Sequence, residues 1–313
     1  MKLLLSSLLL VRSVSAFYTV LAESYTPSDF FTKFNFYTGA DPTNGVVSYI
    51  SQSAASSSGL IRTDPTSVYI GVDTTNAYPN AGRPSVRLES KKTFQRGLII
   101  LDAAHMPAGC GTWPAFWTLG STADWPQAGE IDIVEGVNDA TTNSMALHTT
   151  PGCVMNGGGG TGNMLTKNCD VNAAGQASNQ GCVFSDPRTM SYGTGFNNIG
   201  GGLFATEWNS AFIKVWFFPR GQAPADMFTP NPAPENWGTP VAVFQGDCNI
   251  DEKFMNHRII INTTFCGDWA GSVWGNSSQC QAKASTCAEW VRNNPAAFSE
   301  AYWRINSVKV WSS

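Results

Sequence analysis

The sequence predicts an all-β protein in which two antiparallel sheets pack face to face as a jelly-roll-like sandwich. Short segments with the alternating pattern of strands recur along the chain, whereas helix signals are few and short. The 30 glycines and 17 prolines separate these segments, and both residue types favour the turns that join short strands. Together these observations favour a sandwich over a helical or an α/β fold.

The expected elements follow these patterns in chain order. Residues 27–34, 286–292 and 296–302 have helix start signals. A Ser-rich stretch, residues 51–59, lies between strand-like runs and is predicted to be a surface loop. Residues 149–202 have almost no hydrophobic periodicity, and the three cysteines within them could tie this long loop down. Strands are expected at residues 68–72, 85–89, 98–101, 144–148, 212–218, 259–261 and 308–311.

The N-terminus has the pattern of a secretory signal peptide. Lys2 precedes an apolar run, and the sequence then ends in small residues at Ala16 with the spacing that signal peptidase accepts. We therefore expect residues 1–16 to be removed and the mature protein to be secreted. No membrane association is expected afterwards, because no apolar run is long enough to span a bilayer. Residues 17–313 contain no linker and are expected to form one domain.

The charge of the chain argues against nucleic acid as a partner. The 23 acidic residues outnumber the 19 basic ones, and no basic run is present to contact phosphates. A neutral polymer is a more natural partner for such a surface. No motif for a cofactor is found, and the protein is expected to be a monomer.

Eight cysteines, all beyond the predicted signal peptide, favour disulfides in a secreted chain. Their pairing cannot be chosen from the sequence. No Cys-x-x-Cys pair is present and the histidines are scattered, so no metal is expected. Asn262 and Asn276 stand in Asn-x-Ser/Thr glycosylation signals. Asn276 is the better candidate because it lies in a Gly/Ser-rich stretch, whereas Asn262 follows an apolar run.

The most informative segment is Gly-Glu-Ile-Asp-Ile-Val-Glu-Gly at residues 129–136. Only 13% of the residues are charged, so three acids within six residues, interleaved with the strand formers Ile131, Ile133 and Val134, are unusual. Strand alternation places Glu130 and Asp132 opposite the isoleucines but would bury Glu135 among them. A one-residue bulge at residues 133–134 would bring all three carboxyl groups to one face.

Three carboxyl groups on one sheet face repel each other and need a functional reason. A glycosidase uses one carboxylate to attack the sugar and one carboxylic acid to protonate the leaving oxygen. A solvated acidic face or a calcium loop is the alternative, but neither would be interleaved with strand formers. Glu130 and Glu135 are then the catalytic pair, and Asp132 shares a proton with Glu130. The negative charge of Glu130 is expected to raise the pKa of Glu135.

Tryptophans just before the acidic segment are candidates for sugar binding, because flat indole faces pack against sugar rings. Trp113 and Trp117 are an even number of residues apart and share a strand face, and Trp125 follows in an Asp-Trp-Pro sequence. Core packing is the alternative for any tryptophan in a sandwich. The tryptophans inside apolar runs are assigned to the core, namely Trp216, Trp303 and Trp311.

Two basic residues are further candidates. His148 lies on the polar face of its strand, and its short chain distance from Glu135 allows a neighbouring strand to place it beside the acids. Arg87 also lies on a polar strand face and could bond sugar hydroxyls. The alternatives are a structural histidine and a surface arginine paired with Glu89.

The acidic segment resembles the Glu-x-Asp-x-x-Glu signature of glycoside hydrolase family 16. The whole mature chain is similar to the fungal laminarinases of basidiomycete type, which are endo-1,3(4)-β-glucanases of this family. This resemblance implies a β-jelly roll with a long concave substrate cleft and a retaining mechanism. The further segments that carry it are residues 105–107, 109–114, 124–126, 135–139, 212–220 and 265–271.

The resemblance also implies roles by position. Glu130 matches the nucleophile, Glu135 the general acid/base and Asp132 the assisting acid. Residues 161–187 diverge from the family pattern and leave the preferred chain length open. The residues that match sugar-binding positions are Arg87, Trp117, Trp125, His148 and Trp269.

The expected function is therefore a secreted endo-β-glucanase that hydrolyses β-1,3- and mixed β-1,3-1,4-glucans with retention. A transglycosylase on the same scaffold would use the same residues. A non-catalytic β-glucan-binding module would not need both glutamates. A hydrolase for another polysaccharide, such as a galactan, is the remaining alternative.

Overall fold

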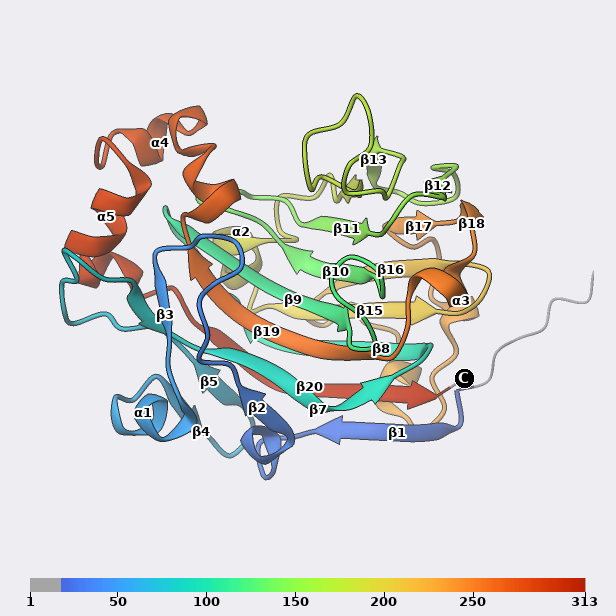
Figure 1. Ribbon diagram of the computed structural model, residues 1–313. Helices are drawn as coiled ribbons and strands as arrows, with labels where there is room; N and C mark the ends of the chain where they lie inside the picture. Colours follow the sequence, from blue (N-terminus) through green and yellow to red (C-terminus); the bar gives the residue numbers. More distant parts are fainter. Residues whose placement is uncertain (1–17, 313) are drawn as a thin grey trace, which may run out of the picture.

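The computed structural model describes residues 18–312, and two large β-sheets pack against each other within them (Figure 1). Each sheet has eight strands, and the neighbouring strands in both are antiparallel. This arrangement confirms the predicted all-β sandwich. The predicted signal peptide, residues 1–16, lies outside the described residues.

The sheet that carries the acidic segment is called the site sheet here. Its central strands are the ones that hold the candidate catalytic residues. In spatial order its strands are β13 (Asn163–Thr166), β14 (Cys182–Ser185), β11 (Ser144–His148), β10 (Glu130–Glu135), β9 (Thr112–Gly120), β19 (His257–Phe265), β7 (Arg87–Phe94) and β2 (Phe34–Phe36).

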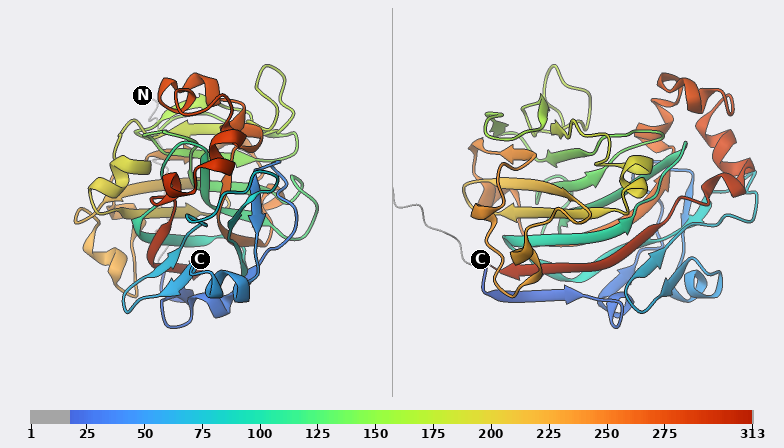
Figure 2. Two further views of the ribbon diagram at one scale, coloured as in Figure 1. Left: turned by 90° about the vertical axis from the view of Figure 1, so that its left-hand side faces the viewer. Right: turned by 180° about the vertical axis from the view of Figure 1, so that it is seen from behind.

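The back sheet covers the inner face of the site sheet, and the right-hand view of Figure 2 shows it from its outer side. Its longest strand is the C-terminal one, drawn in red. In spatial order its strands are β17 (Ala242–Phe244), β16 (Ile213–Pro219), β15 (Gly202–Trp208), β8 (Gly97–His105), β20 (Trp303–Ser312), β5 (Val68–Ile70) and β4 (Ile61–Thr63), with β1 (Val20–Tyr25) also paired to β20.

The main core lies between the two sheets and follows directly from strand alternation. Every second residue of β10 and β11, such as Ile131 and Leu147, is fully buried against back-sheet residues such as Leu101 and Phe204. Burying one such side chain contributes about 1.5–3 kcal/mol, so this set of contacts fixes which face of each strand points inward. The candidate acids are thereby forced to the outer face of the site sheet. The three tryptophans assigned to the core are buried as predicted.

Helices are short, and the sequence predicts them only in part. The helix expected from residue 286 is α5 (Cys287–Asn293), which begins at the Thr286 cap. The helices expected at residues 27–34 and 296–302 are reduced to 3-10 turns at Phe30–Lys33 and Pro295–Phe298. The other short α-helices are α1 (Gln52–Ser57), α2 (Gly193–Asn198), α3 (Ile250–Lys253) and α4 (Ser278–Gln281). None of the helices in the described part of the chain is long and apolar enough to cross a bilayer.

The stretch expected to be a Ser-rich surface loop, residues 51–59, is instead largely the helix α1. The Ser51 side chain accepts a hydrogen bond from the backbone N–H of Ala54, which is the standard N-cap interaction. Ala55 is buried against the main core. A serine run therefore forms a helix here because one cap and one small apolar contact are sufficient to dock a short turn of helix.

The first part of the long segment 149–202, as far as β14, is folded onto the edge of the site sheet, with β12 (Cys153–Met155) and β13 above β11 in Figure 1. Its last part forms α2, whose Phe196 packs against Phe204 and Phe217 of the back sheet. The first part contributes β13 and β14 to the site sheet, and also β12, which pairs with β18 (Gly246–Cys248). Two disulfides, Cys153–Cys248 and Cys169–Cys182, hold it. The expectation that cysteines tie this segment down is thus confirmed.

The helices α4 and α5 form a separate block at one end of the sandwich, drawn in orange-red at the left of Figure 1. A small apolar cluster around Trp274 and Val291 lies beneath them. Two further disulfides, Cys110–Cys280 and Cys266–Cys287, attach this block to the ends of the site-sheet strands. The parallel pair β3 (Val47–Tyr49) and β6 (Arg83–Ser85) lies at the same end.

Candidate active site

The predicted bulge is present in β10, and it decides where the acids point. Between Asp132 and Glu135 the strand advances three residues, while its partner β11 advances only two, from Ala146 to Ser144. The register with β9 shifts at the same place. One residue is therefore extra, which returns Glu135 to the face of Glu130 and Asp132. The prediction that all three acids share one face is confirmed.

A glycine stands at each end of the acidic segment for steric reasons. Gly129 has φ of +80°, and a Cβ there would lie 2.3 Å from the carbonyl oxygen of Lys253. A Cβ on Gly136 would lie 2.6 Å from the phenol ring of Tyr192, in the core behind Glu135. Both glycines therefore allow neighbouring segments to pack tightly against the ends of β10.

Each glutamate accepts a hydrogen bond from a tryptophan indole. Trp125 Nε1 donates to Glu130 Oε2 at 2.6 Å, and Trp113 Nε1 donates to Glu135 Oε1 at 2.9 Å. Both carboxyl groups are half-buried. The two tryptophans were expected to present their ring faces to a sugar, but in this structure their N–H groups also orient the carboxylates.

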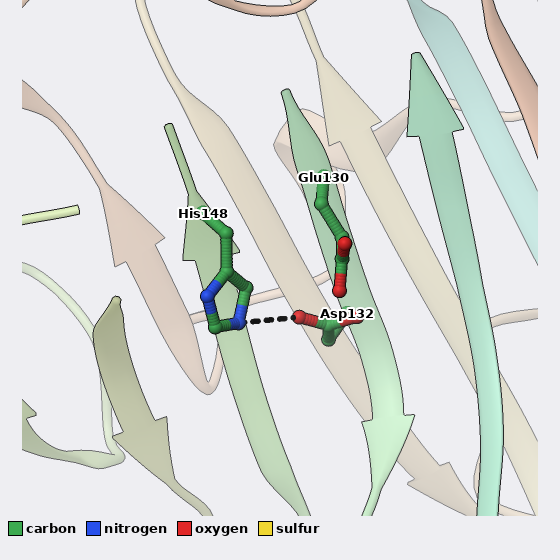
Figure 3. A group of neighbouring side chains, drawn as sticks. All are labelled: Glu130, Asp132 and His148. Atoms are coloured by element: carbon green, nitrogen blue, oxygen red, sulfur yellow. Dashed lines mark ion pairs between the residues drawn. The ribbon is translucent and has the colours of Figure 1, made fainter. Parts of the chain in front are cut away.

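Asp132 lies deeper than the two glutamates and faces a histidine. It is only 1% exposed, and its Oδ2 lies 3.1 Å from His148 Nε2 (Figure 3). The strand register places His148 directly opposite Glu130. The histidine expected beside the acids is thus in that position.

These three side chains are also the one group of possible metal ligands found among residues 18–312. Glu130, Asp132 and His148 each offer one ligand atom, and the three atoms lie within 4.8 Å of one another. Two carboxylates and an imidazole suit a divalent cation such as zinc. The expectation that the protein uses no metal stays a prediction.

Burial is the main cause of the unusual ionisation of the acids. It raises the pKa of Glu130 to about 8 and that of Glu135 to about 7. It also raises the pKa of Asp132 well above its ordinary range, and the charge of Glu135 adds to this effect. The predicted direction for Glu135 is correct, but desolvation outweighs the charge of Glu130 as the cause. Because the groups interact, the cluster titrates as a unit and shares its protons.

A second group of residues continues the site face beyond the acids. Arg87 is 7% exposed, and its guanidinium lies near the rings of both Trp117 and Tyr37, 5.1 and 4.8 Å from their centroids. Its Nε donates to Glu89 Oε1 at 3.0 Å. The alternative pairing with Glu89 is therefore real, but the pair is buried on the site face rather than on the open surface.

Asn262 belongs to this second group, which corrects its assignment as a glycosylation candidate. It is 6% exposed, its Oδ1 accepts from Trp117 Nε1 at 2.8 Å, and its Nδ2 donates to the hydroxyl of Tyr49 at 3.2 Å. A glycan attached to Nδ2 would have to displace the buried contact of this nitrogen with Tyr49. Asn276, by contrast, is exposed in the α4–α5 block.

Trp269 is brought to the acids from a distant part of the chain. It lies on a single π-helical turn, Gly267–Gly271, that follows β19. Its ring meets that of Trp113 edge to face, with centroids 5.6 Å apart. Trp125 lies at the other side, 6.4 Å from the His148 ring. Aromatic rings therefore border the acids on two sides.

The predicted catalytic and sugar-binding residues lie on one face of the site sheet or in loops beside it, whereas the glycosylation candidate Asn276 lies apart from them. Sequence reasoning missed three residues of the group around Arg87. These are Tyr37, Tyr49 and Asn262, the last of which accepts a hydrogen bond from Trp117. Tyr37 and Tyr49 belong to the N-terminal segment, whose spacing from the acids gives no local signal. Asn262 was noticed only as a glycosylation signal, although its alternating position in β19 places it on the site face.

Comparison with known proteins agrees with this geometry. A family model described as the XgeA-like catalytic GH16 domain matches residues 34–311. An endo-1,3(4)-β-glucanase of Arthroderma benhamiae is 49% identical over 296 residues, which cover 93% of this chain and 64% of the relative. The chain thus spans less than two thirds of the length of that relative.

Two solved structures are similar over nearly their whole length. Laminarinase 16A from Phanerochaete chrysosporium, solved with β-glucans in its donor and acceptor sites, has a TM-score of 0.89 and 42% identity. The match covers 95% of this chain and 100% of that one. An elongating family 16 β-1,3-glucosyltransferase has a TM-score of 0.88 and 42% identity, with coverages of 94% and 99%. The chain belongs to glycoside hydrolase family 16.

Proposed function

We propose that this chain is a retaining endo-β-glucanase that hydrolyses β-1,3- and mixed β-1,3-1,4-glucans by double displacement. The observation that carries the proposal is the bulged strand, which sets Glu130 and Glu135 on one open face with Asp132 buried between them. The relative from Arthroderma and the laminarinase from Phanerochaete, named for activity on such glucans, support the substrate class.

In the first step Glu130 attacks the anomeric carbon and forms a glycosyl-enzyme ester. At the same time protonated Glu135 gives its proton to the leaving glycosidic oxygen. The raised pKa of Glu135, about 7, keeps this proton available in acidic and neutral solution. In the second step Glu135, now a carboxylate, takes a proton from a water molecule, and the water attacks the anomeric carbon of the ester. Glu130 is released as a carboxylate, and the sugar product keeps the anomeric configuration of the substrate.

Asp132 and His148 support the nucleophile. Asp132 is the most buried of the three acids and its pKa is raised well above the ordinary range, so it is the group that retains a proton. The reactive form has its protons on Asp132 and Glu135 and its negative charge on Glu130, where attack requires it. Because the pKa of Glu130 is about 8, this form is a minority of the free protein below that pH. The contact with His148 holds Asp132 in place and offers a route for its proton.

The aromatic border supports a polysaccharide rather than a small substrate. Trp113 and Trp269 lie beside Glu135, and Trp125 lies beside Glu130. Arg87, Trp117 and their neighbours extend the face across β9, β19 and β7. Sugar rings bound on both sides of the scissile bond are what endo-acting cleavage requires, because the cut falls inside the polymer.

The azide test examines the nucleophile directly. Glu130→Ala should lose at least about 1,000-fold in kcat on laminarin, because the covalent step is removed. With an activated aryl β-laminaribioside as substrate, sodium azide should restore turnover of this variant. The product should be the α-glycosyl azide, because azide attacks from the face that Glu130 has vacated. The control is Glu135→Ala, for which azide should give the β-glycosyl azide. If the Glu130→Ala variant gives no α-glycosyl azide while its circular dichroism spectrum matches that of the wild type, the assignment of Glu130 as nucleophile is contradicted.

A transglycosylase is the second candidate function, because the elongating glucosyltransferase is as similar in structure as the laminarinase. The two activities share the glycosyl-enzyme ester and differ in whether water or a sugar resolves it. Incubation with laminarihexaose at millimolar concentration distinguishes them. Shorter products alone indicate hydrolysis, whereas products longer than the hexaose indicate transfer.

We further propose that the mature protein is a secreted monomer glycosylated at Asn276. The four disulfides suit an oxidising compartment, and the exposed side chain of Asn276 has room for a glycan. N-terminal sequencing of the secreted protein should begin at Phe17. Light scattering should give one chain per particle, and Asn276→Gln should remove the shift in mass that endoglycosidase treatment causes.

A further inference from the structure

The bulge in β10 is bound on both sides by one side chain. Asn143, just before β11, is 1% exposed. Its Oδ1 accepts from the backbone N–H of Glu135 at 3.0 Å, and its Nδ2 donates to the carbonyl of Ile133 at 2.8 Å. Only this orientation of the amide satisfies both partners, because the N–H needs an acceptor and the carbonyl needs a donor. The amide thus takes part in the ladder where the extra residue interrupts strand pairing.

Asn143 is itself held by the segment that follows β14. Its backbone N–H donates to Ser191 Oγ at 2.9 Å, and its carbonyl accepts from the N–H of Asp186 at 2.9 Å. Ser191 Oγ in turn donates to the carbonyl of Arg188 at 2.7 Å. The residue that grips the bulge is therefore fixed by a buried network and does not depend on a mobile side chain.

We propose that Asn143 is a positioning residue that fixes the bulge and thereby aims Glu135 at the leaving glycosidic oxygen. The inference rests on the proposed glycosidase function. A strand without the extra residue would turn Glu135 into the core, so the bulge decides whether this carboxyl group is available. A buried N–H or carbonyl left without its partner drives the backbone to rearrange, and here the rearranged residue is Glu135.

The inference makes a prediction that depends on the leaving group. Asn143→Ala should reduce kcat/KM about 100-fold on laminarin, whose leaving sugar oxygen needs the proton of Glu135. With a 2,4-dinitrophenyl β-glycoside of laminaribiose, which leaves without a proton, kcat/KM should fall less than about 5-fold. Azide should raise kcat on the activated substrate and give the β-glycosyl azide, because Glu130 still forms the ester.

Asn197 provides a matched control. Its Oδ1 accepts from the N–H of Met106 at 2.9 Å, and its Nδ2 donates to the Met106 carbonyl at 3.0 Å, so it grips backbone with the same two bonds. It lies in α2, and its partner follows a back-sheet strand rather than the acidic segment. Asn197→Ala should therefore lower the melting temperature while changing kcat/KM on both substrates by the same small factor.

Asn143→Asp provides a second variant in case the alanine variant does not fold. Its carboxylate keeps the acceptor for the Glu135 N–H but can donate to Ile133 only when protonated. Its activity on laminarin relative to wild type should therefore increase as the pH falls. A constant ratio from pH 4 to pH 8 would contradict the proposed donor role.

The outcomes separate this inference from the proposed function. Wild-type protein that releases no reducing sugar from laminarin and leaves the activated glycoside intact would overturn the function itself. If the wild type is active but Asn143→Ala loses kcat/KM by the same factor on both substrates, as is expected of Asn197→Ala, only the positioning role is overturned. A loss confined to laminarin, with azide acceleration on the activated glycoside, supports it.

Discussion

At the scale of single residues, the two catalytic glutamates differ in their partners. Glu130 faces Trp125, Asp132 and His148, whereas the carboxyl group of Glu135 accepts a hydrogen bond from the Trp113 indole. An N–H donor stabilises a carboxylate over a carboxylic acid, so each indole opposes the rise in pKa that burial causes. The tryptophan N–H groups therefore help to tune the ionisation of the acids.

The Trp113 indole gives a testable effect on the pH profile. The hydrogen bond from Trp113 lowers the pKa of Glu135, so Trp113→Phe should raise this pKa. Glu135 must be protonated in the first step, and activity should fall as the pH rises through about 7 in the wild type. In the variant that fall should move about half a pH unit higher or more in a plot of kcat/KM on laminarin.

Trp125→Phe is the matched comparison. It removes the donor to Glu130 and should raise the pKa of Glu130, about 8 in the wild type, so kcat/KM below pH 7 should fall because less Glu130 is ionised for attack. Equal profiles for the two variants, or a flat wild-type profile between pH 4 and pH 8, would contradict the assigned roles.

The possible ligands Glu130, Asp132 and His148 allow a test of metal independence. We expect EDTA to leave activity unchanged, because the proposed steps need only proton transfer and a nucleophile. Added Zn²⁺ should inhibit, since a cation at these three ligands would occupy Glu130. Assays of EDTA-treated protein with and without Zn²⁺ measure both effects. Loss of activity on EDTA treatment, restored by a metal, would show that the site uses one.

Residue type and face could be predicted from the sequence, but contact geometry could not. Alternation in β10 and one bulge were enough to place Glu130 and Glu135 together. Other features depend on residues far away in the chain. They are the direction of an indole N–H, the position of Arg87 near two aromatic rings and the two hydrogen bonds of Asn262. Local pattern carries no information on such pairs.

At the scale of elements, strands were predictable where their two faces differ in polarity, whereas among the α-helices of residues 18–312 only α5 was predicted. The strands of the main core alternate clearly, because one face packs on the other sheet. The helix α1 consists of small residues with one buried alanine, so it has no periodic signal. The strands β12 to β14 depend on disulfides and edge pairing rather than on a buried apolar face.

The two disulfides of residues 149–202 should contribute unequally to stability. Cys153–Cys248 spans 95 residues and Cys169–Cys182 spans 13. The chain-entropy model assigns about 2 kcal/mol more stabilisation to the larger loop. Replacing each pair by serines and measuring urea unfolding should therefore show the greater loss for the first pair. A greater loss for the short loop would mean that native contacts, rather than unfolded-state entropy, set the contribution.

At the scale of the whole molecule, the rest of the fold compensates for a cluster of buried acids that lowers the stability of the protein. The core between the sheets provides the favourable free energy, while three desolvated acids on the outer face of the site sheet are costly. The four disulfides tie the surrounding segments to the sandwich, so the acids stay in place although they repel each other.

This cost should appear as a pH-dependent melting temperature. The pKa of Glu130 is about 8 in the folded protein against an ordinary 4.5, so between these values the unfolded chain ionises first. The contribution of Glu130 to stability is thus complete below about pH 4.5 and is lost as the pH rises through about 8. Glu130→Gln cannot ionise and should be about 4 kcal/mol more stable than wild type at pH 8, but nearly equal to it at pH 4. The exposed Glu252 provides the control, since Glu252→Gln should follow the wild type at both pH values. Melting curves at pH 4, 6 and 8 measure the difference, and a Glu130→Gln curve parallel to wild type would show that Glu130 is not desolvated in the free protein.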